Sequence, residues 1–240
     1  MSHVAKPATR VLVYGLQRSG TTWISSVIDQ LDGARCAEEV LLETPVLPGS
    51  YRSEAPALFP IWRRILQPVR SRVDFLDQLL SPSTETPIVG AKLMYPQIGW
   101  PVRLTGRLTR RWPQLSPLLS MRSLRRWMID RGVVVVLVER RNVLKLRISE
   151  LIAQQSGIIH STDGARSIRG IHLDPSTLVS RLDRTQRRQQ AARRFLKGCE
   201  VVEILYESRE EDKRLALQAA LGIEAAIELE TRYRKVTAVD

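Results

Sequence analysis

Cysteine, histidine and aromatic residues are scarce in this chain. The 240 residues include 2 cysteines and 3 histidines, and aromatic residues make up 5% of the total. Cys36 and Cys199 lie far apart and outside any CxxC spacing, which is typical of a reducing compartment and predicts two buried, unpaired thiols. His3, His160 and His172 do not group with cysteine or acidic residues at ligand spacing. We therefore expect no metal site.

Long apolar runs are also missing. The first ten residues, MSHVAKPATR, lack the apolar core of a leader peptide, and the longest apolar run, 133–138, is too short to span a bilayer. We therefore expect a soluble, cytoplasmic protein without stable membrane insertion. The hydrophobic content of 43% is enough for a core, and the absence of repeats predicts one domain over residues 1–240. No pattern in the sequence indicates an oligomeric state.

Charge of one sign is in excess. The formal net charge is +12, with arginine clusters at 103–126 and 181–197. Such a balance attracts nucleic acid, anionic lipid or a strongly anionic small ligand. In the second cluster an apolar stripe at helical spacing indicates a solvated amphipathic helix. Aromatic residues are not interleaved with the basic ones, so nucleic-acid binding is not expected.

Strand-like and helix-like segments alternate along the chain, which predicts an α/β domain with a parallel sheet. The expected strands are 11–14, 35–42 (a short strand or an extended arm), 88–94, 133–138 and, as the last strand, 201–206. The first expected helix follows the first strand and ends near residue 31, and the second covers 61–80 with an interruption at Pro68. Further helices are expected at 120–129, at 141–155, from Asp174-Pro175 onward, and at 211–221. Two irregular segments, 44–60 and 96–117, separate these elements and are expected to shape a binding pocket.

The segment Val11–Leu31 predicts an anion-binding turn. It reads as a short buried strand, a turn between Gly15 and Gly20, and a helix. The backbone N–H groups of Arg18 to Thr22 would point outward at the start of the helix, where the helix dipole adds positive potential. Together with the side chains of that turn, these groups favour a bound phosphate.

The turn lacks the residues of two common nucleotide motifs. A nucleotide-hydrolysing P-loop needs a lysine after its second glycine, but Thr21 occupies that place. Gln17 stands where a dinucleotide-binding turn has its second glycine. An anion site is therefore expected, and ATP hydrolysis is not.

A second group of polar residues follows the strand 133–138. Arg140, Arg141 and Asn142 lie at its carboxyl end, where open α/β sheets bind ligands, and Ser149 comes eight residues after Arg141. Arg141 and Ser149 could therefore meet over one phosphate, although an ordinary charged helix explains the pattern equally well. Lys92 lies inside the apolar strand 88–94, where a lysine needs a partner or reaches a site.

These two stretches resemble the cofactor motifs of one enzyme family. QRSGTTW, 17–23, resembles the 5′-phosphosulfate loop of sulfotransferases that use 3′-phosphoadenosine 5′-phosphosulfate (PAPS). RNVLKLRIS, 141–149, is similar to the 3′-phosphate motif of that family. VGAKLMYPQ, and IHLDPSTL followed by VVEILYE, resemble its bacterial carbohydrate branch, which includes trehalose and nodulation-factor sulfotransferases. The resemblance extends from Val11 to about Leu221.

The resemblance implies a fold and a cofactor. The fold would be α/β, a P-loop-type three-layer structure with a central parallel sheet flanked by helices. PAPS would be the cofactor, with 3′-phosphoadenosine 5′-phosphate (PAP) as product and no metal. The 5′ end would be held by the loop residues Arg18, Ser19, Gly20, Thr21 and Thr22, with Trp23 on the adenine, and the 3′-phosphate by Arg141 and Ser149.

The resemblance also implies the catalytic groups. Arg18 replaces the loop lysine of many members and would stabilise the departing phosphate oxygen. No histidine matches the base of the cytosolic small-molecule enzymes, so the base would be a glutamate, as in the bacterial branch. Glu38, Glu39 and Glu43 are the candidates, and Glu39 is preferred. Lys92 would contact the sulfuryl group or the acceptor, which would be a hydroxyl of a carbohydrate, a glycolipid or a hydroxylated natural product.

Two other classes of function remain open from the sequence. A kinase-like phosphoryl transferase on a similar P-loop fold is opposed by the missing glycine-lysine pair. A non-catalytic protein that binds anions or nucleic acid is favoured only by the net charge of +12.

Overall fold

The fold is that of a computed structural model, which describes residues 8–38, 68–95, 115–156, 168–169, 171, 173–223 and 238–239. A five-stranded sheet lies at its centre, in the order β2-β3-β1-β4-β6, and every neighbouring pair is parallel. The strands are β1 (Thr9–Gly15), β2 (Ala34–Ala37), β3 (Ile88–Met94), β4 (Val134–Glu139) and β6 (Glu200–Leu205). The expected α/β fold with a central parallel sheet is confirmed.

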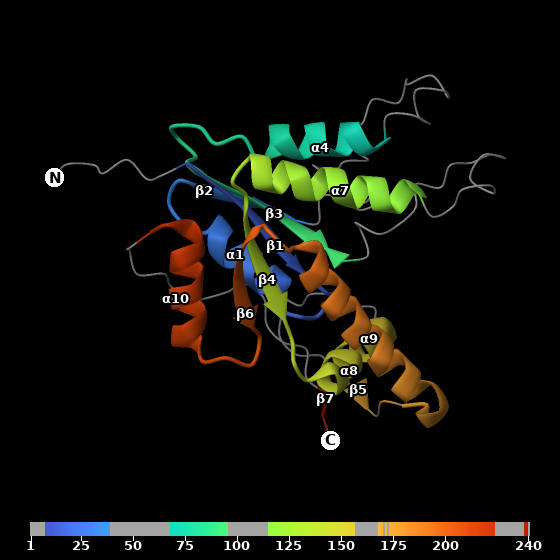
Figure 1. The fold of residues 1–240 in the computed structure, drawn as a ribbon. Helices are drawn as coiled ribbons and strands as arrows, with labels where there is room; N and C mark the ends of the chain where they lie inside the picture. Colours follow the sequence, from blue (N-terminus) through green and yellow to red (C-terminus); the bar gives the residue numbers. More distant parts are fainter. Residues whose placement is uncertain are drawn as a thin grey trace.

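Helices cover both faces of the sheet (Figure 1). On one face, alternate residues of the strands form a core with α4, α7 and α9, and on the other they form a second core with α1 and α10. The helices are α1 (Thr21–Asp29), α4 (Pro68–Leu79), α7 (Leu115–Asp130), α8 (Val143–Ser156), α9 (Pro175–Phe195) and α10 (Glu210–Leu221). β1, β3 and β4 are apolar almost throughout because helices cover both of their sides.

Local chemistry explains several element boundaries. Asp174 caps α9 by accepting a hydrogen bond from the Ser176 N–H at 3.0 Å, and Pro175 occupies the first helical position, as expected. α10 ends at Gly222, which adopts the left-handed conformation with φ 62°. Asn142 caps α8 by accepting from the Lys145 N–H at 2.9 Å, so Arg141 precedes the helix.

Some sequence-based boundaries were wrong. α7 begins at Leu115 rather than at residue 120, because Pro117 falls in the first turn, where a helix needs no N–H donor. α4 begins at Pro68, where an interruption of the segment 61–80 was expected, and 61–67 lie outside the described residues. β6 is not the last strand, because β7 (Ala238–Val239) pairs with β5 (Ile168–Arg169) in a small parallel sheet.

The two cysteines differ in their exposure. Cys36 is buried as predicted, but Cys199 is partly exposed, and both are free thiols.

Among the residues that the structure describes, no helix is long and apolar enough to cross a bilayer.

Candidate active site

The turn between β1 and α1 has the backbone of an anion-binding loop. Gly20 is the N-cap of α1 with φ 98° and ψ 7°, and no side chain caps the helix. The first-turn N–H groups of a helix have no acceptor within the helix, so they can bind an anion at this end. Within the loop, the Ser19 hydroxyl donates to the Leu16 carbonyl at 2.7 Å and its N–H donates to the same oxygen at 3.3 Å. Ser19 thus holds the loop closed, and its N–H does not point outward as the sequence suggested.

Two backbone positions in this loop need special geometry. Arg18 has φ 65° and is the non-glycine residue with positive φ among those described. At Gly15, a Cβ atom would lie 2.6 Å from the Val138 carbonyl oxygen, so only glycine allows β1 to approach β4 at its end. The loop is therefore held in one shape by close packing as well as by hydrogen bonds.

A Gly20→Ala variant should show how tightly the loop is packed. A left-handed alanine costs about 1–2 kcal/mol, and its Cβ would also lie 2.7 Å from the Tyr206 ring. Gly132→Ala is the matched control, because Gly132 also has positive φ but has no neighbouring atom within 4 Å of the Cβ position. In urea unfolding, Gly20→Ala should lose clearly more stability than Gly132→Ala. Equal losses would mean that Tyr206 does not constrain the loop.

Arg18 connects the loop to α8. Its Nε donates a hydrogen bond to the Ser149 hydroxyl at 3.1 Å. Burial lowers the pKa of the Arg18 guanidinium, and the nearby positive charge of Arg140 acts in the same direction. The two stretches that resemble cofactor motifs are thus in direct contact, although 131 positions separate these residues in the sequence.

Lys92 reaches the same loop from the centre of the sheet. It is 1% exposed, and its ammonium donates to the Thr22 hydroxyl at 3.0 Å. It also forms an ion pair with Glu38, which follows β2 and whose side chain is 43% exposed. The other carboxylate oxygen of Glu38 lies 3.5 Å from the Ser25 hydroxyl. Lys92 therefore places one positive charge between the start of α1 and a carboxylate that is open to solvent.

The end of β4 carries the second group of polar residues. The N–H groups of Arg141 and Asn142 each donate to the Glu207 carboxylate at 3.1 Å. Burial acts to raise the pKa of Glu207, but these two backbone hydrogen bonds and the charge of Arg140 outweigh it, and the pKa is lowered. The lowered pKa favours the ionised carboxylate, which binds the two N–H groups just before α8.

Tyr206 joins these parts of the site. Its ring lies against Gly20, and the Arg140 guanidinium stacks over it, 4.7 Å from the ring centre. The Lys213 ammonium of α10 lies 5.4 Å from the ring centres of both Tyr206 and Trp23. These contacts place two aromatic rings and two cations beside the loop.

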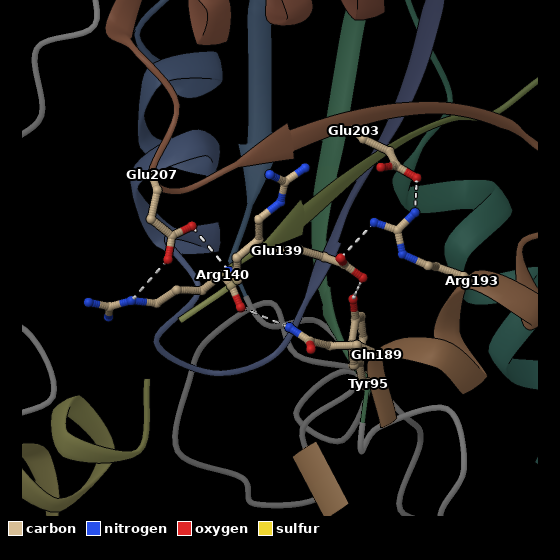
Figure 2. Close-up of polar contacts among 8 residues, drawn as sticks. Tyr95, Glu139, Arg140, Gln189, Arg193, Glu203 and Glu207 are labelled. Carbon is tan, nitrogen blue, oxygen red and sulfur yellow. Dashed lines mark hydrogen bonds and ion pairs between the residues drawn. The ribbon is translucent and has the colours of Figure 1, made fainter. Parts of the chain in front are cut away.

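An ion pair between an exposed arginine and a buried carboxylate anchors α9 beside this site (Figure 2). The Glu139 carboxylate, at the end of β4, accepts from Arg193 of α9 at 2.8 Å and from the Tyr95 hydroxyl at 3.4 Å. Arg193 also pairs with Glu203 of β6. The hydrogen bond to Glu139 raises the pKa of Arg193, whereas burial, with Glu139 alongside, raises that of Tyr95. The end of β4, directly before Arg140, is therefore fixed to the sheet and to α9.

The structure brings most of the predicted site residues to one place. Arg18, Lys92 and Ser149 are linked through the contacts above to the start of α1, which carries the other loop residues: Ser19, Gly20, Thr21, Thr22 and Trp23. The side chain of Arg141 is exposed at the end of β4, whereas Ser149 contacts Arg18. Glu39 and Glu43 lie outside the described residues, and so do 44–60 and 96–114.

Sequence reasoning missed three residues of the site: Tyr206, Glu207 and Lys213. The first two directly follow β6, so the rule that ligands bind at the carboxyl ends of parallel strands applied to them as it did to Arg140. Lys213 had no comparable signal. Among the residues that the structure describes, no three histidine, cysteine or acidic side chains are grouped as metal ligands would be.

Comparison with solved structures finds chains of similar fold. No family model matches the chain, and no curated protein sequence matches it. The crystal structure of a sulfotransferase from Alicyclobacillus acidocaldarius is similar over 95% of this chain and 86% of that chain, with a TM-score of 0.48 and 12% sequence identity. This similarity is too low to carry an argument about function. The proposal below therefore rests on the residues of the site.

Proposed function

We propose that the protein transfers a sulfuryl group from PAPS to a hydroxyl acceptor. The observation that carries the proposal is the hydrogen bond from Arg18 Nε to the Ser149 hydroxyl, 3.1 Å long. It joins a loop suited to a 5′-phosphosulfate with a motif suited to a 3′-phosphate. A nucleotide with phosphates at both the 5′ and the 3′ position fits such a site, whereas a nucleoside triphosphate has no phosphate at the 3′ position.

The donor groups fit this cofactor. PAPS supplies the sulfuryl group and leaves as PAP. The open first turn of α1, with Thr21 and Thr22, would hold the 5′-phosphate, and Arg18 would stabilise negative charge on the departing oxygen. Arg141 and Ser149 would hold the 3′-phosphate, and Trp23 the adenine. The amides, hydroxyls and cations among these groups suit the phosphates of a highly anionic nucleotide, and the aromatic ring suits its base.

We assign the general base to Glu38 rather than to Glu39. Glu38 already lies beside the loop through its ion pair with Lys92, and its side chain is 43% exposed, so an acceptor can reach it. A bond would form between the acceptor oxygen and sulfur while the bond from sulfur to the phosphate oxygen breaks. Glu38 would take the hydroxyl proton. Lys92 would lower the cost of negative charge near the transferred group.

The acceptor class follows from the family resemblance. A hydroxyl of a carbohydrate, a glycolipid or a hydroxylated natural product is consistent with a glutamate base beside an open loop. Segments 44–60 and 96–117 are proposed to shape its pocket.

The proposal can be tested by nucleotide binding and by transfer. Calorimetry without magnesium should show PAP binding and no binding of ATP at the same concentration. Radiolabelled PAPS should then label a member of a panel of sugar, glycolipid and phenolic acceptors. Tight binding of magnesium-ATP with PAP ignored would indicate phosphoryl transfer instead. Salt-dependent DNA binding without nucleotide binding would indicate a non-catalytic protein.

An Arg141→Ala variant should lose affinity for the 3′-phosphate specifically. Removing a hydrogen bond to a charged group costs about 1.5–3 kcal/mol, so PAP should bind about 10-fold to 150-fold more weakly, while adenosine 5′-phosphate should change little. Calorimetry measures both. Arg126→Ala is the control, because Arg126 on α7 is an exposed arginine whose loss lowers the net charge equally. If both nucleotides lose the same affinity in Arg141→Ala, the 3′-phosphate assignment is wrong.

A further inference from the structure

Glu207 fixes the peptide that precedes Arg141. Its two carboxylate oxygens accept from the consecutive N–H groups of Arg141 and Asn142, each at 3.1 Å. The carbonyl of Arg140 belongs to the same peptide group as the Arg141 N–H, and it accepts from Gln189 Nε2 of α9 at 3.0 Å. This peptide is therefore held on both sides (Figure 2). Its orientation sets the direction in which the Arg141 side chain leaves the backbone.

The same carboxylate occupies the start of α8. A phosphate near this end of α8 could use the N–H groups of Arg141 and Asn142, but Glu207 of the same chain already binds both, and the Asn142 side chain binds the Lys145 N–H in the first turn. A negative charge beside an anion site would weaken binding if it were free. Glu207 instead contacts two N–H groups and lies 3.9 Å from Arg140 Nε. Its charge is thus largely compensated.

Tyr206 connects Glu207 to the other end of the cofactor site. The Tyr206 N–H donates to the Glu139 carbonyl at 2.8 Å, which extends the pairing of β6 with β4 by one residue. The Tyr206 ring lies against Gly20 of the loop. Tyr206 contacts the loop, and Glu207 binds the backbone at Arg141. These two neighbouring residues therefore fix the position of the loop relative to that of Arg141.

We propose that Glu207 is a positioning residue for recognition of the 3′-phosphate, an inference that rests on the proposed function. It orients the backbone of Arg141 and occupies the N–H groups of Arg141 and Asn142, so a phosphate cannot bind to these two groups. Selectivity for a 3′-phosphorylated nucleotide then comes from the side chains of Arg141 and Ser149 and not from a helix N-terminus.

The test compares nucleotide selectivity in Glu207→Gln with that of the wild type. Selectivity is the Kd for adenosine 5′-phosphate divided by the Kd for PAP, both from calorimetry. We expect Glu207→Gln to lower it about tenfold, because an amide offers one acceptor where two N–H groups need one each. Glu203→Gln is the control: Glu203 also pairs with an arginine, Arg193, but lies outside the cofactor site. It should leave selectivity unchanged.

A double variant tests whether Glu207 changes nucleotide selectivity through Arg141. If Glu207 acts through Arg141, Glu207→Gln should change selectivity little when Arg141 is already alanine. Unchanged selectivity in Glu207→Gln, tighter PAP binding, or an effect that persists without Arg141 would overturn the inference. If Glu207→Gln does not fold, Glu207→Asp replaces it, and an intermediate loss is expected because the shorter side chain reaches one N–H group. A wild-type protein without preference for PAP would sink the proposed function, and this inference with it.

A second readout does not involve nucleotide. In NMR spectra of the wild type, the amide signals of Arg141 and Asn142 should titrate together as Glu207 protonates. Because the pKa of Glu207 lies below its ordinary value of 4.5, their midpoint should lie below that pH. The hydrogen bonds should therefore be complete above pH 4.5 and lost as the pH falls through the lowered pKa. Amide signals that do not respond would overturn the positioning role whatever the nucleotide results.

Discussion

A Glu38→Gln variant should lose about 10²-fold to 10⁴-fold in kcat, the usual contribution of a general base. Glutamine keeps the size of the side chain but cannot take the acceptor proton. Binding of PAP should change little, because the loop, Arg141 and Ser149 are the groups that we propose to bind the two phosphates. Steady-state transfer assays and calorimetry measure the two quantities separately.

Glu39→Gln and Glu43→Gln are the matched variants for this experiment. Each removes one carboxylate from the same short segment. If Glu39→Gln or Glu43→Gln loses turnover while Glu38→Gln keeps it, the assignment of the base to Glu38 is wrong. Wild-type turnover in all three would exclude a glutamate base from this segment.

A Lys92→Met variant should separate activity from stability. Replacing a buried ion pair by apolar side chains of similar volume is often neutral or stabilising, whereas removing one partner is costly when the other charge stays buried. Lys92 is 1% exposed, and methionine is an apolar side chain of similar volume. Its carboxylate partner, Glu38, is open to water and can be solvated once the lysine is gone. We expect the free energy of unfolding to stay within about 1.5 kcal/mol of the wild type. The value of kcat should fall about 10²-fold to 10³-fold, as when a donor to developing charge is removed.

Lys197→Met is the control for Lys92→Met, because Lys197 is exposed and follows α9. It should change neither quantity. If Lys92→Met keeps full activity, Lys92 has only a structural role. If Lys92→Met unfolds the protein, the ion pair with Glu38 contributes more to stability than a buried charge pair usually does, and the proposed division between activity and stability fails.

Local signals in the sequence predicted the elements well. The apolar run 88–94 became β3 with the same bounds, because a strand covered on both faces contains little else. Asp174-Pro175 and Gly222 marked helix ends, since caps depend on one or two residues. Lys92 stood out for a similar reason, as a charge in an apolar strand.

Contacts between distant segments could not be predicted in this way. Ala37 of β2 lies opposite Ala91 of β3, and this register brings Glu38, the residue after Ala37, to Lys92. No residue near Glu38 indicates which strand lies beside it, so the sequence alone favoured Glu39. The contact of Arg18 with Ser149 likewise depends on how β1 and β4 pair, and Tyr206 reaches Gly20 only because β6 lies next to β4.

The position of β1 has a consequence for how the chain is made. β1 is the first of the described strands along the chain, yet it lies in the middle of the sheet, between β3 and β4. Its apolar residues therefore leave the ribosome long before β4 exists, with both backbone edges open to pairing with other chains. The ring that packs against Gly20 belongs to Tyr206, which directly follows β6, so the loop carried by β1 reaches its final packing only after that later part of the chain has been made.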